Sequence, residues 1–344
     1  MADNKYIYTP QDFKSDQEVK WCPGCGDYAI LNSVVKAMPE VAKRDGIPHE
    51  KFVVVSGIGC SSRFPYYVNI YGFHSIHGRA AAIATGLKVA NPDLSVWVTS
   101  GDGDSLAIGG NHFIHAIRRN IDLNLIIFNN QIYGLTKGQY SPTSEFGKIT
   151  KTSPFGTVEY PFKPGELVLG ARGKFFARSL DVEVGLTQQL CEAGAEHKGM
   201  SVIEVLQNCV IFNDKTFAKF TATKELREEK TIVLKHGERM LFGKEKNKGL
   251  RLNGLKLEVV TIGENGVTEE DVLIHDAHEP NPSIHMMLAD MEGPDFPVAL
   301  GIIRDVKDDS YDNRVCQQVA DVQSNCQIHN VDELLNSGNV WEVK

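Results

Sequence analysis

Four cysteine side chains are the first residues of this sequence whose spacing suggests chemistry. Cys22 and Cys25 form a C-x₂-C pair in the segment WCPGCG, whereas Cys60 and Cys209 lie far along the chain. A redox dithiol would need a preceding strand, and none precedes Trp21. A zinc ribbon would need a second C-x₂-C pair about 15–20 residues further on, and none follows. The remaining interpretation takes metal ligands from distant segments.

These distant segments share a position in the expected fold. Cys60 and Cys209 each follow an apolar run typical of a buried parallel strand, and ligands of open α/β sheets bind at the carboxyl edge of such strands. We therefore expect all four thiols to converge there. Four thiolates suit a [4Fe–4S] cluster, and zinc held by the same thiols is the alternative. The cysteines without patterned neighbours are interpreted as buried or incidental thiols: Cys191, Cys316 and Cys326.

A second pattern consists of a strand that ends in SGDGD (100–104), a helix, and a strand that ends in Asn-Asn (129–130). Glycines before a helix let backbone N–H groups approach a phosphate. Mg²⁺ prefers oxygen ligands, usually one or two carboxylates together with phosphate oxygens. Asp102, the side chain of Asn130 and a backbone carbonyl near Ile132 can supply such oxygens. The spacing favours a diphosphate with Mg²⁺ over two turns in an ordinary strand–helix–strand unit.

The elements that must position these groups alternate along the first 210 residues. Apolar runs predict strands at 52–56, 94–99, 123–129 and 201–206, and apolar periodicity predicts helices at 28–38, 78–90, 105–119 and 182–197. Such alternation predicts an α/β fold with a doubly wound parallel sheet. Residues 136–173, rich in Gly, Pro, Ser and Thr, are expected to form a long functional loop. We expect one domain at 1–210 and a C-terminal extension or arm at 211–344 that packs on a partner.

Composition narrows the class of protein. The chain has 344 residues, 42% hydrophobic and 23% charged, which is ordinary for a soluble globular protein. No long apolar run or signal-peptide core occurs, so we expect no membrane span and a cytoplasmic location. In that compartment the seven cysteines are not a disulfide framework. A net charge of −8 argues against nucleic-acid binding.

Several segments together resemble one enzyme family. The segments WCPGCG, GIGCSSR (57–63), HGRA (77–80), GDGD (101–104), NNQIYGLTKGQYSPTS (129–144) and QNCV (207–210) resemble the β subunits of 2-oxoacid:ferredoxin oxidoreductases. The resemblance runs from about residue 20 to 215, and EPNPSIHMMLADM (279–291) is most similar to the 2-oxoglutarate type. It implies a fold of thiamine-diphosphate-binding type and CoA-dependent oxidative decarboxylation of a 2-oxoacid, with 2-oxoglutarate giving succinyl-CoA. Electrons would pass through a [4Fe–4S] cluster to ferredoxin, and the physiological direction stays open.

The resemblance also implies roles for residues. Cys22, Cys25, Cys60 and Cys209 would hold the cluster. Asp102, Asn130 and the Ile132 carbonyl would hold Mg²⁺. The residues that it places against thiamine diphosphate are Ile58, Gly59, Cys60, Ser61, His77, Gly101, Gly103, Asp104, Gly134 and Leu135. For His77, a packing or capping role is the alternative.

Two basic residues match family positions that face the substrate. Arg63 is expected to bind a substrate carboxylate, because its planar fork pairs bidentately with that group. Lys137 lies in the loop after the Asn-Asn pair. Simple solvation at the surface is the alternative for each.

A partner is expected as well. Thiamine enzymes activate the cofactor with a glutamate from a pyrimidine-binding domain, which this family carries on an α subunit, and this sequence shows only one thiamine-type unit. The chain alone should therefore be inactive, with CoA-binding residues on the partner and an αβ or (αβ)₂ assembly. One rival is a cluster-free thiamine decarboxylase of acetolactate type, which would need the second domain in the same chain. The other is a zinc-ribbon binding module, which predicts a basic surface.

Overall fold

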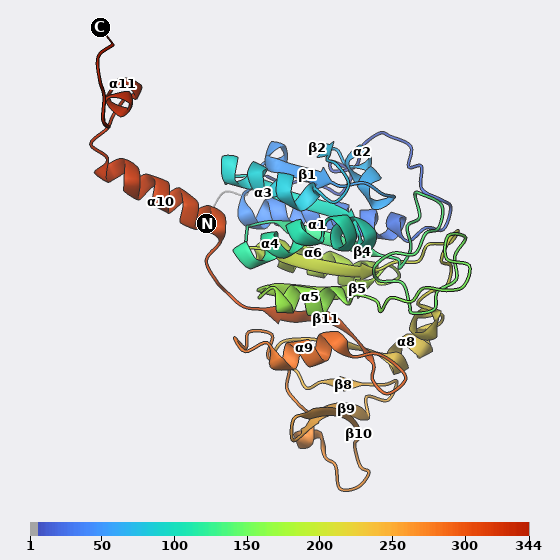
Figure 1. Cartoon of the computed structure of the whole chain (residues 1–344). Helices are drawn as coiled ribbons and strands as arrows, with labels where there is room; N and C mark the ends of the chain where they lie inside the picture. Colours follow the sequence, from blue (N-terminus) through green and yellow to red (C-terminus); the bar gives the residue numbers. More distant parts are fainter. Residues whose placement is uncertain (1–5, 344) are drawn as a thin grey trace.

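An eight-stranded sheet forms the centre of the molecule (Figure 1). The computed structural model describes residues 6–343, so the outermost residues of the two expected domains, 1–5 and 344, lie outside the described residues. The strand order is β2-β1-β3-β4-β6-β5-β11-β7. The bounds are β1 (Phe52–Ser56), β2 (Tyr71–His74), β3 (Ser95–Gly101), β4 (Asn124–Asn129), β5 (Phe175–Leu180), β6 (Ser201–Leu206), β7 (Thr231–Leu234) and β11 (Val298–Asp305). Neighbouring strands are parallel except β11, which runs antiparallel to β5, so the sheet is mostly rather than wholly parallel.

Helices cover both faces of this sheet, as the double winding predicts. The helices are α1 (Asp27–Asp45), α2 (Phe64–Tyr67), α3 (Ala80–Ala90), α4 (Gly110–Arg119), α5 (Pro164–Gly170) and α6 (Val184–Glu196). Side chains of β1 alternate between two apolar cores. Val53 and Val55 join the core that contains residues of α3 and α4, whereas Phe52 and Val54 join the core that contains residues of α1 and α6. Burial on both faces explains the continuous apolar runs.

Every strand and helix expected in the first 210 residues is present; β1 and β6 have the predicted bounds, and the ends of the others are shifted. The first helix continues to Asp45 and contains Pro39. The expected helix at 105–119 begins instead as a π-helical turn, Asp104–Ile108, and becomes α4 only after Gly109. Gly109 is required there because a Cβ atom would lie 2.3 Å from the Asp104 carbonyl oxygen. The loop at 136–173 is irregular apart from its short helix α5.

Four strands of the central sheet were not expected, β2, β5, β7 and β11, and three of them have a physical reason. The edge strand β2 is exposed along its whole length, so it lacks a buried apolar pattern. The strand β5 (FFARSL) is wholly buried but contains Arg178 and Ser179, and β11 contains Gly301 and Arg304. Buried polar residues with tertiary partners hide a core strand from a search for apolar runs.

The chain past residue 210 returns to the central sheet. It contributes β7 and β11, and Phe217, Phe220, Val298 and Leu300 pack against Leu180 and Leu206. The remaining elements are a three-stranded antiparallel sheet of β8 (Leu241–Phe242), β9 (Lys248–Asn253) and β10 (Lys256–Thr261), and the helices α7 (Ala218–Thr221), α8 (Lys224–Lys230), α9 (Ser283–Asp290), α10 (Tyr311–Asn325) and α11 (Val331–Leu335). Of these, only α10 and α11 project from the body as an arm (Figure 1).

Among the residues 6–343, none of the helices has both the length and the apolar character needed to cross a bilayer.

Candidate active site

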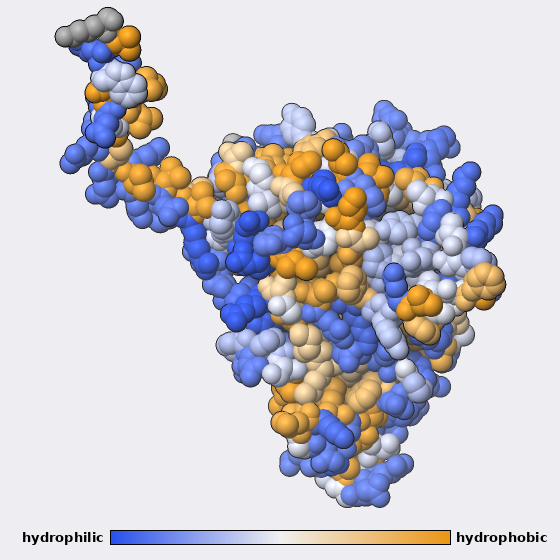
Figure 2. All heavy atoms as spheres, viewed as in Figure 1, coloured by the Kyte–Doolittle hydropathy of each residue, from blue (hydrophilic) through white to orange (hydrophobic). Residues whose placement is uncertain are grey.

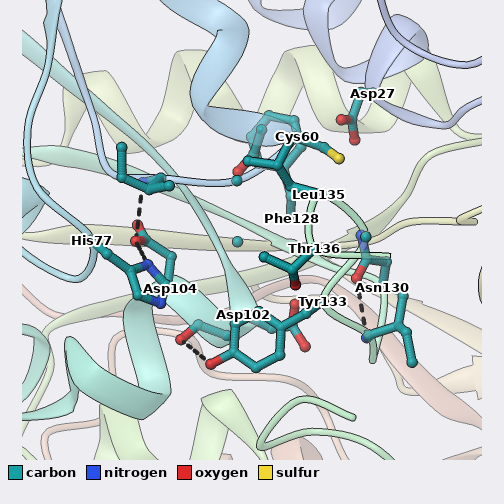
Figure 3. Close-up of a pocket in the computed structure, with 17 residues that line it drawn as sticks. Asp27, Cys60, His77, Asp102, Asp104, Phe128, Asn130, Tyr133, Leu135 and Thr136 are labelled. Atoms are coloured by element: carbon teal, nitrogen blue, oxygen red, sulfur yellow. Dashed lines mark hydrogen bonds and ion pairs between the residues drawn. The ribbon is translucent and has the colours of Figure 1, made fainter. Parts of the chain in front are cut away.

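A cavity opens at the carboxyl edge of the sheet, between the loops that follow β1, β3 and β4 (Figure 3). It brings together all the residues expected at the diphosphate and its metal ion: Ile58, Gly59, Cys60, Ser61, His77, Gly101, Asp102, Gly103, Asp104, Asn130, Ile132, Gly134 and Leu135. These residues come from segments up to 77 positions apart, and the parallel strand order β1-β3-β4 places them side by side. Asp27, Phe128, Tyr133 and Thr136 complete the lining.

Asp104 connects three loops of the cavity. Its Oδ1 accepts hydrogen bonds from the backbone N–H groups of Ile58 (3.1 Å) and Gly78 (2.7 Å) and lies 2.6 Å from His77 Nδ1. Its Oδ2 accepts from Ser100 Oγ at 2.5 Å. The carboxylate approaches so closely that a Cβ on Gly57 would lie 1.8 Å from Oδ2. Asp104 thus fixes the positions of the loops that surround the cavity.

Asp102 is a buried carboxylate with hydroxyl partners. Ser141 Oγ donates to its Oδ2 at 2.5 Å, and Thr143 Oγ1 donates to the same oxygen. Burial raises the pKa of this carboxyl to about 6, although the hydrogen bonds from Ser141 and Thr143 lower it. A bound cation would favour the ionised form of such a group.

The two asparagines after β4 face different partners. Asn130 donates to Gln207 Oε1 at 2.8 Å, and its Oδ1 accepts from the backbone N–H of Ile132 at 3.2 Å. Asn130 is part of the cavity lining, but Asn129 is not. Asn129 Nδ2 instead donates to the buried Glu204 Oε1 at 2.7 Å. Asn129 therefore contacts a buried residue outside the cavity and does not face the cavity itself.

Two further groups, Tyr133 and Ser61, shape the lining of the cavity. The Tyr133 hydroxyl donates to the Gly103 carbonyl at 3.0 Å, and its ring leaves no room for a side chain at Gly103, where a Cβ would lie 2.2 Å from Cε1. Burial raises the pKa of Tyr133 to about 12, so it stays a neutral donor. The buried Ser61 hydroxyl has no hydrogen-bond partner among the described residues, and ideal Cβ atoms on Gly59 and Gly101 would lie 4.0 and 3.6 Å from it. Such an unsatisfied hydroxyl in the lining can donate to a phosphate oxygen.

The three cysteine-bearing segments are tied together by hydrogen bonds. Trp21 Nε1 donates to the Cys60 carbonyl at 2.8 Å, so the C-x₂-C loop reaches the loop after β1. The Gly26 N–H donates to the Asn208 carbonyl at 3.3 Å, and Gln207 Nε2 lies 3.4 Å from Cys25 Sγ, which joins the same loop to the segment after β6.

Gly134 lies beside two of the thiols. A Cβ atom on Gly134 would lie 3.4 Å from Cys60 Sγ and 3.7 Å from Cys209 Sγ. Cys60 and Cys209 are therefore neighbours, and the convergence of all four thiols stays a prediction. Among residues 6–343, however, no group of three or more His, Cys, Asp or Glu side chains has the geometry of a site for a single metal ion. Tetrahedral zinc needs four sulfurs at about 2.3 Å from one point.

Burial and neighbouring negative charge keep the thiols of Cys25 and Cys60 neutral. Burial, followed by the charge of Asp27, raises the pKa of Cys60 to about 12 and that of Cys25 even higher. Asp27 itself is 1% exposed, and neither of its carboxylate oxygens has a partner among the described residues. Burial, with the charge of Asp181, raises the pKa of Asp27 to about 7.

Arg63 and Lys137 lie outside the lining of the cavity, in turns next to it. Arg63 Nε donates to the Tyr67 hydroxyl at 2.9 Å, and no carboxylate of residues 6–343 forms an ion pair with it. Lys137 is exposed and has φ +75°, the left-handed region that non-glycine residues seldom adopt. Strained backbone of this kind is often found at functional sites.

The comparisons with known proteins agree with this arrangement. Residues 57–205 match the family model of the thiamine pyrophosphate enzymes' C-terminal TPP-binding domain. The chain is 48% identical to the 2-oxoglutarate oxidoreductase subunit KorB of Mycobacterium tuberculosis over 90% of this chain and 81% of that protein. It belongs to the family of 2-oxoacid:ferredoxin oxidoreductase β subunits.

Two further relatives of this 2-oxoacid:ferredoxin oxidoreductase β subunit differ in extent. The 2-oxoglutarate synthase subunit KorB of Archaeoglobus fulgidus is 46% identical over 55% of this chain and 69% of that protein. A solved 2-oxoglutarate:ferredoxin oxidoreductase from Magnetococcus marinus, with 2-oxoglutarate, coenzyme A and succinyl-CoA bound, is 30% identical. It covers 97% of each chain with a TM-score of 0.75, so the C-terminal part of this β subunit has a counterpart there.

Several residues of this oxidoreductase subunit were missed by sequence reasoning. Asp27 follows the C-x₂-C loop directly and looks like an ordinary acidic residue in the first turn of a helix. Tyr133 lies inside the segment used for the resemblance but carries no pattern of its own. Ser141 and Thr143 lie in the same resemblance segment, inside the expected loop, and no local signal connects them with Asp102, which lies about 40 residues earlier.

Proposed function

We propose that this β subunit binds thiamine diphosphate, Mg²⁺ and a [4Fe–4S] cluster, and that it acts in the CoA-dependent conversion of 2-oxoglutarate to succinyl-CoA with electron transfer to ferredoxin. One observation carries the proposal. A single cavity at the carboxyl edge is lined both by the oxygens suited to a metal diphosphate, at Asp102 and Asn130, and by the thiol-bearing residue Cys60. A cluster-free thiamine enzyme has no use for the convergent thiols.

The residues fit a metal-bound diphosphate. The Asp102 carboxylate, the Asn130 amide oxygen and the Ile132 carbonyl would hold Mg²⁺, which prefers such oxygens. Ser61 has an unused hydroxyl in the lining that would donate to the diphosphate. When bound, thiamine diphosphate supplies the nucleophilic carbon and electron sink for decarboxylation, and an iron–sulfur cluster supplies one-electron transfer. The protein's part is to hold both groups side by side.

The thiols fit an iron–sulfur cluster better than zinc. Cys22, Cys25, Cys60 and Cys209 would be its ligands. Zinc has no redox chemistry, whereas a cluster at this place would give electrons released in the neighbouring cavity a way out of the site. Cys22 is the exposed member of the four, so electrons would leave on its side.

Arg63 and Lys137, in the turns beside the cavity, would bind the substrate. Arg63 is anchored through Nε to Tyr67, which leaves the outer edge of its guanidinium for a carboxylate of the 2-oxoacid. Lys137, at the tip of a strained turn, would add a second positive charge.

The assembly would include an α subunit that carries the pyrimidine-binding domain and the CoA site, in an αβ or (αβ)₂ complex with ferredoxin as electron acceptor. A cytoplasmic location suits the free cysteines. The reaction would be reversible under reducing conditions, with reductive carboxylation as the reverse direction.

The first experiment is metal analysis of the anaerobically purified full chain. We expect brown protein with about four irons and four sulfides per chain, as a [4Fe–4S] centre requires. Cys209→Ser should lose most of the iron, whereas Cys316→Ser, in the projecting helix α10, should retain it. Colourless protein with stoichiometric zinc would remove the electron path and overturn the proposal.

A further inference from the structure

Asp102, the proposed metal ligand, contacts a row of buried polar residues that lies outside the cavity. The row consists of Thr143, Asn129, Glu204 and Arg178. Thr143 Oγ1 lies within hydrogen-bonding distance of Asp102 Oδ2 and 3.0 Å from Asn129 Oδ1, so its single proton is shared between these two acceptors. Asn129 Nδ2 donates to Glu204 Oε1 at 2.7 Å, and Glu204 Oε2 accepts from Arg178 Nε at 2.7 Å. All five side chains are buried, with 6% exposure or less.

The sheet itself sets the spacing of this row. Arg178 on β5 and Glu204 on β6 are direct partners in the parallel register, and Asn129 is the last residue of the next strand, β4. Thr143 lies in the loop that returns beneath Asp102. Each polar side chain therefore stands on a different element, and the row crosses the sheet from the C-terminal part to the cavity. Arg178 extends it further by donating to the Ala289 carbonyl at the end of α9.

Stability alone is a poor explanation for such a row. Burying an ion pair costs desolvation free energy that the mutual attraction often only balances, and apolar residues of similar volume usually serve a core as well or better. A side-chain hydroxyl pair on one carboxylate oxygen, by contrast, has an evident geometric effect. Ser141 and Thr143 together restrict rotation of the Asp102 carboxylate and so define where its oxygens point.

We propose that Arg178, Glu204 and Asn129 are positioning residues for the metal site: they fix Thr143, which with Ser141 holds Asp102 in the orientation that binds the divalent cation of the diphosphate. The proposal rests on the proposed function and adds the residues that set its cation affinity. Partners that orient metal ligands commonly change metal affinity by about 10–100-fold. It also assigns different tasks to the neighbouring asparagines, because Asn130 lines the cavity and Asn129 supports it.

The test measures Mg²⁺ affinity rather than turnover. The complex of the full chain with its partner subunit is freed of Mg²⁺ by chelation, and Mg²⁺ is titrated calorimetrically at saturating thiamine diphosphate. Thr143→Val removes the hydroxyl with little change in shape and should weaken Mg²⁺ binding by about tenfold. Thr143→Ser keeps the hydroxyl and should stay within about twofold of wild type.

Controls separate this effect from a loss of folding. Thr85→Val removes a helix hydroxyl that bonds only within α3 and should leave Mg²⁺ affinity unchanged. The melting temperature of each metal-free complex is recorded alongside. If Thr143→Val does not fold, Ser141→Ala, which removes the other hydroxyl on Asp102, takes its place and should weaken Mg²⁺ binding in the same direction.

A double-mutant cycle tests the path through the row. Glu204→Gln should weaken Mg²⁺ binding several-fold in the wild-type background but have no further effect in the Thr143→Val background, because its influence passes through Thr143. Fully additive effects would overturn the path.

These measurements can refute the role of the row without refuting the proposed function. Asp102→Ala should abolish Mg²⁺ binding. If it does so while Thr143→Val and Ser141→Ala, both folded, bind Mg²⁺ like wild type, the row is refuted and the metal site stands. If wild-type protein itself binds no Mg²⁺ with thiamine diphosphate, both proposals fall.

Discussion

At the scale of single residues, close approach decides several positions around the cavity. Gly57 has no room for a side chain because Asp104 Oδ2 occupies the place of its Cβ, whereas Gly86 in α3 has open space around it. Asp104 must come this close to accept hydrogen bonds from the loops at Ile58 and Gly78. Glycine is therefore tied to the function of the site at position 57 and not at position 86.

Alanine substitutions at these two glycines should have opposite effects on stability. Gly57→Ala should destabilise the protein by about 1–3 kcal/mol, because the Asp104 carboxylate must move. Gly86→Ala should stabilise it by about 0.5–1 kcal/mol, since alanine loses less backbone freedom in a helix. Chemical unfolding of both variants measures the difference. Equal effects of the two substitutions would contradict the close approach.

The guanidinium of Arg63 leads to a kinetic prediction. Arg63→Met should raise the KM for 2-oxoglutarate about 10–100-fold, because a charge-assisted hydrogen bond contributes about 1.5–3 kcal/mol. Arg63→Lys keeps the charge but loses the planar fork, so it should recover only part of the affinity. Steady-state kinetics of the complete complex with its partner provides the measurement. Unchanged KM in Arg63→Met would assign the residue to surface solvation.

At the scale of elements, buried histidines hold the C-terminal segment against the sheet. His275 is 1% exposed and its Nε2 lies 2.8 Å from the Ile302 carbonyl of β11. In α9, His285 accepts at Nδ1 from Arg304 Nη1 (2.9 Å), while its Nε2 lies 2.7 Å from the Asp276 carbonyl. Burial lowers the pKa of His275 to about 4 and also lowers that of His285. Both rings are neutral in the folded chain at pH 7.

The lowered histidine pKa predicts a loss of stability in mild acid. Between pH 6.5 and 4 the unfolded chain binds a proton at residue 275 that the folded chain does not, so this group's contribution falls as pH falls. By pH 4, protonation of His275 in the unfolded chain lowers the free energy of unfolding by about 3 kcal/mol, since each pKa unit corresponds to about 1.4 kcal/mol. His275→Gln should therefore flatten the fall in unfolding free energy from pH 7 to 4.5. The control is His329→Gln in the exposed arm, which should leave the pH dependence unchanged. If unfolding free energy falls with pH in parallel for wild type and His275→Gln, His275 does not have this role.

At the scale of the whole molecule, the cavity wall is incomplete. Ile58 and Leu135 line it but are 41% and 48% exposed, and the nearby loop presents Phe155 and Tyr160 at 100% and 84% exposure. Apolar side chains also lie along the projecting arm (Figure 2). In its helix α11, Leu334 and Leu335 are 59% and 69% exposed. Exposed apolar surface of this extent is typical of protein–protein interfaces. We interpret both regions as candidate contacts with the partner subunit.

The incomplete wall predicts dependence on a partner. The purified chain, reconstituted with thiamine diphosphate, Mg²⁺ and iron–sulfur cluster, should show no CoA-dependent oxidation of 2-oxoglutarate. Addition of the α subunit should restore it, because we propose that this subunit carries the pyrimidine-binding half of the site. Reduction of ferredoxin or of an artificial dye follows the reaction. Full turnover by the chain alone would refute this division of the active site.

The amino-acid sequence by itself determined those strands and helices that have a clear local pattern, and the motifs that follow the strands. Runs buried on both faces predicted β1, β3, β4 and β6, and the glycine and asparagine motifs at their carboxyl ends, together with Cys60, predicted residues that line one cavity. This succeeded because parallel strands share an edge, so that position along a strand translates directly into position in space.

Only the tertiary structure decided which buried polar groups meet. The strand β5 was hidden because Arg178 looks like a surface residue until Glu204 is placed beside it on β6. Asp27, Ser141 and Thr143 gain their meaning from contacts with residues far along the chain or from the lack of any partner. Hydrogen bonds between distant side chains depend on strand order and register, and no short segment of sequence contains that information.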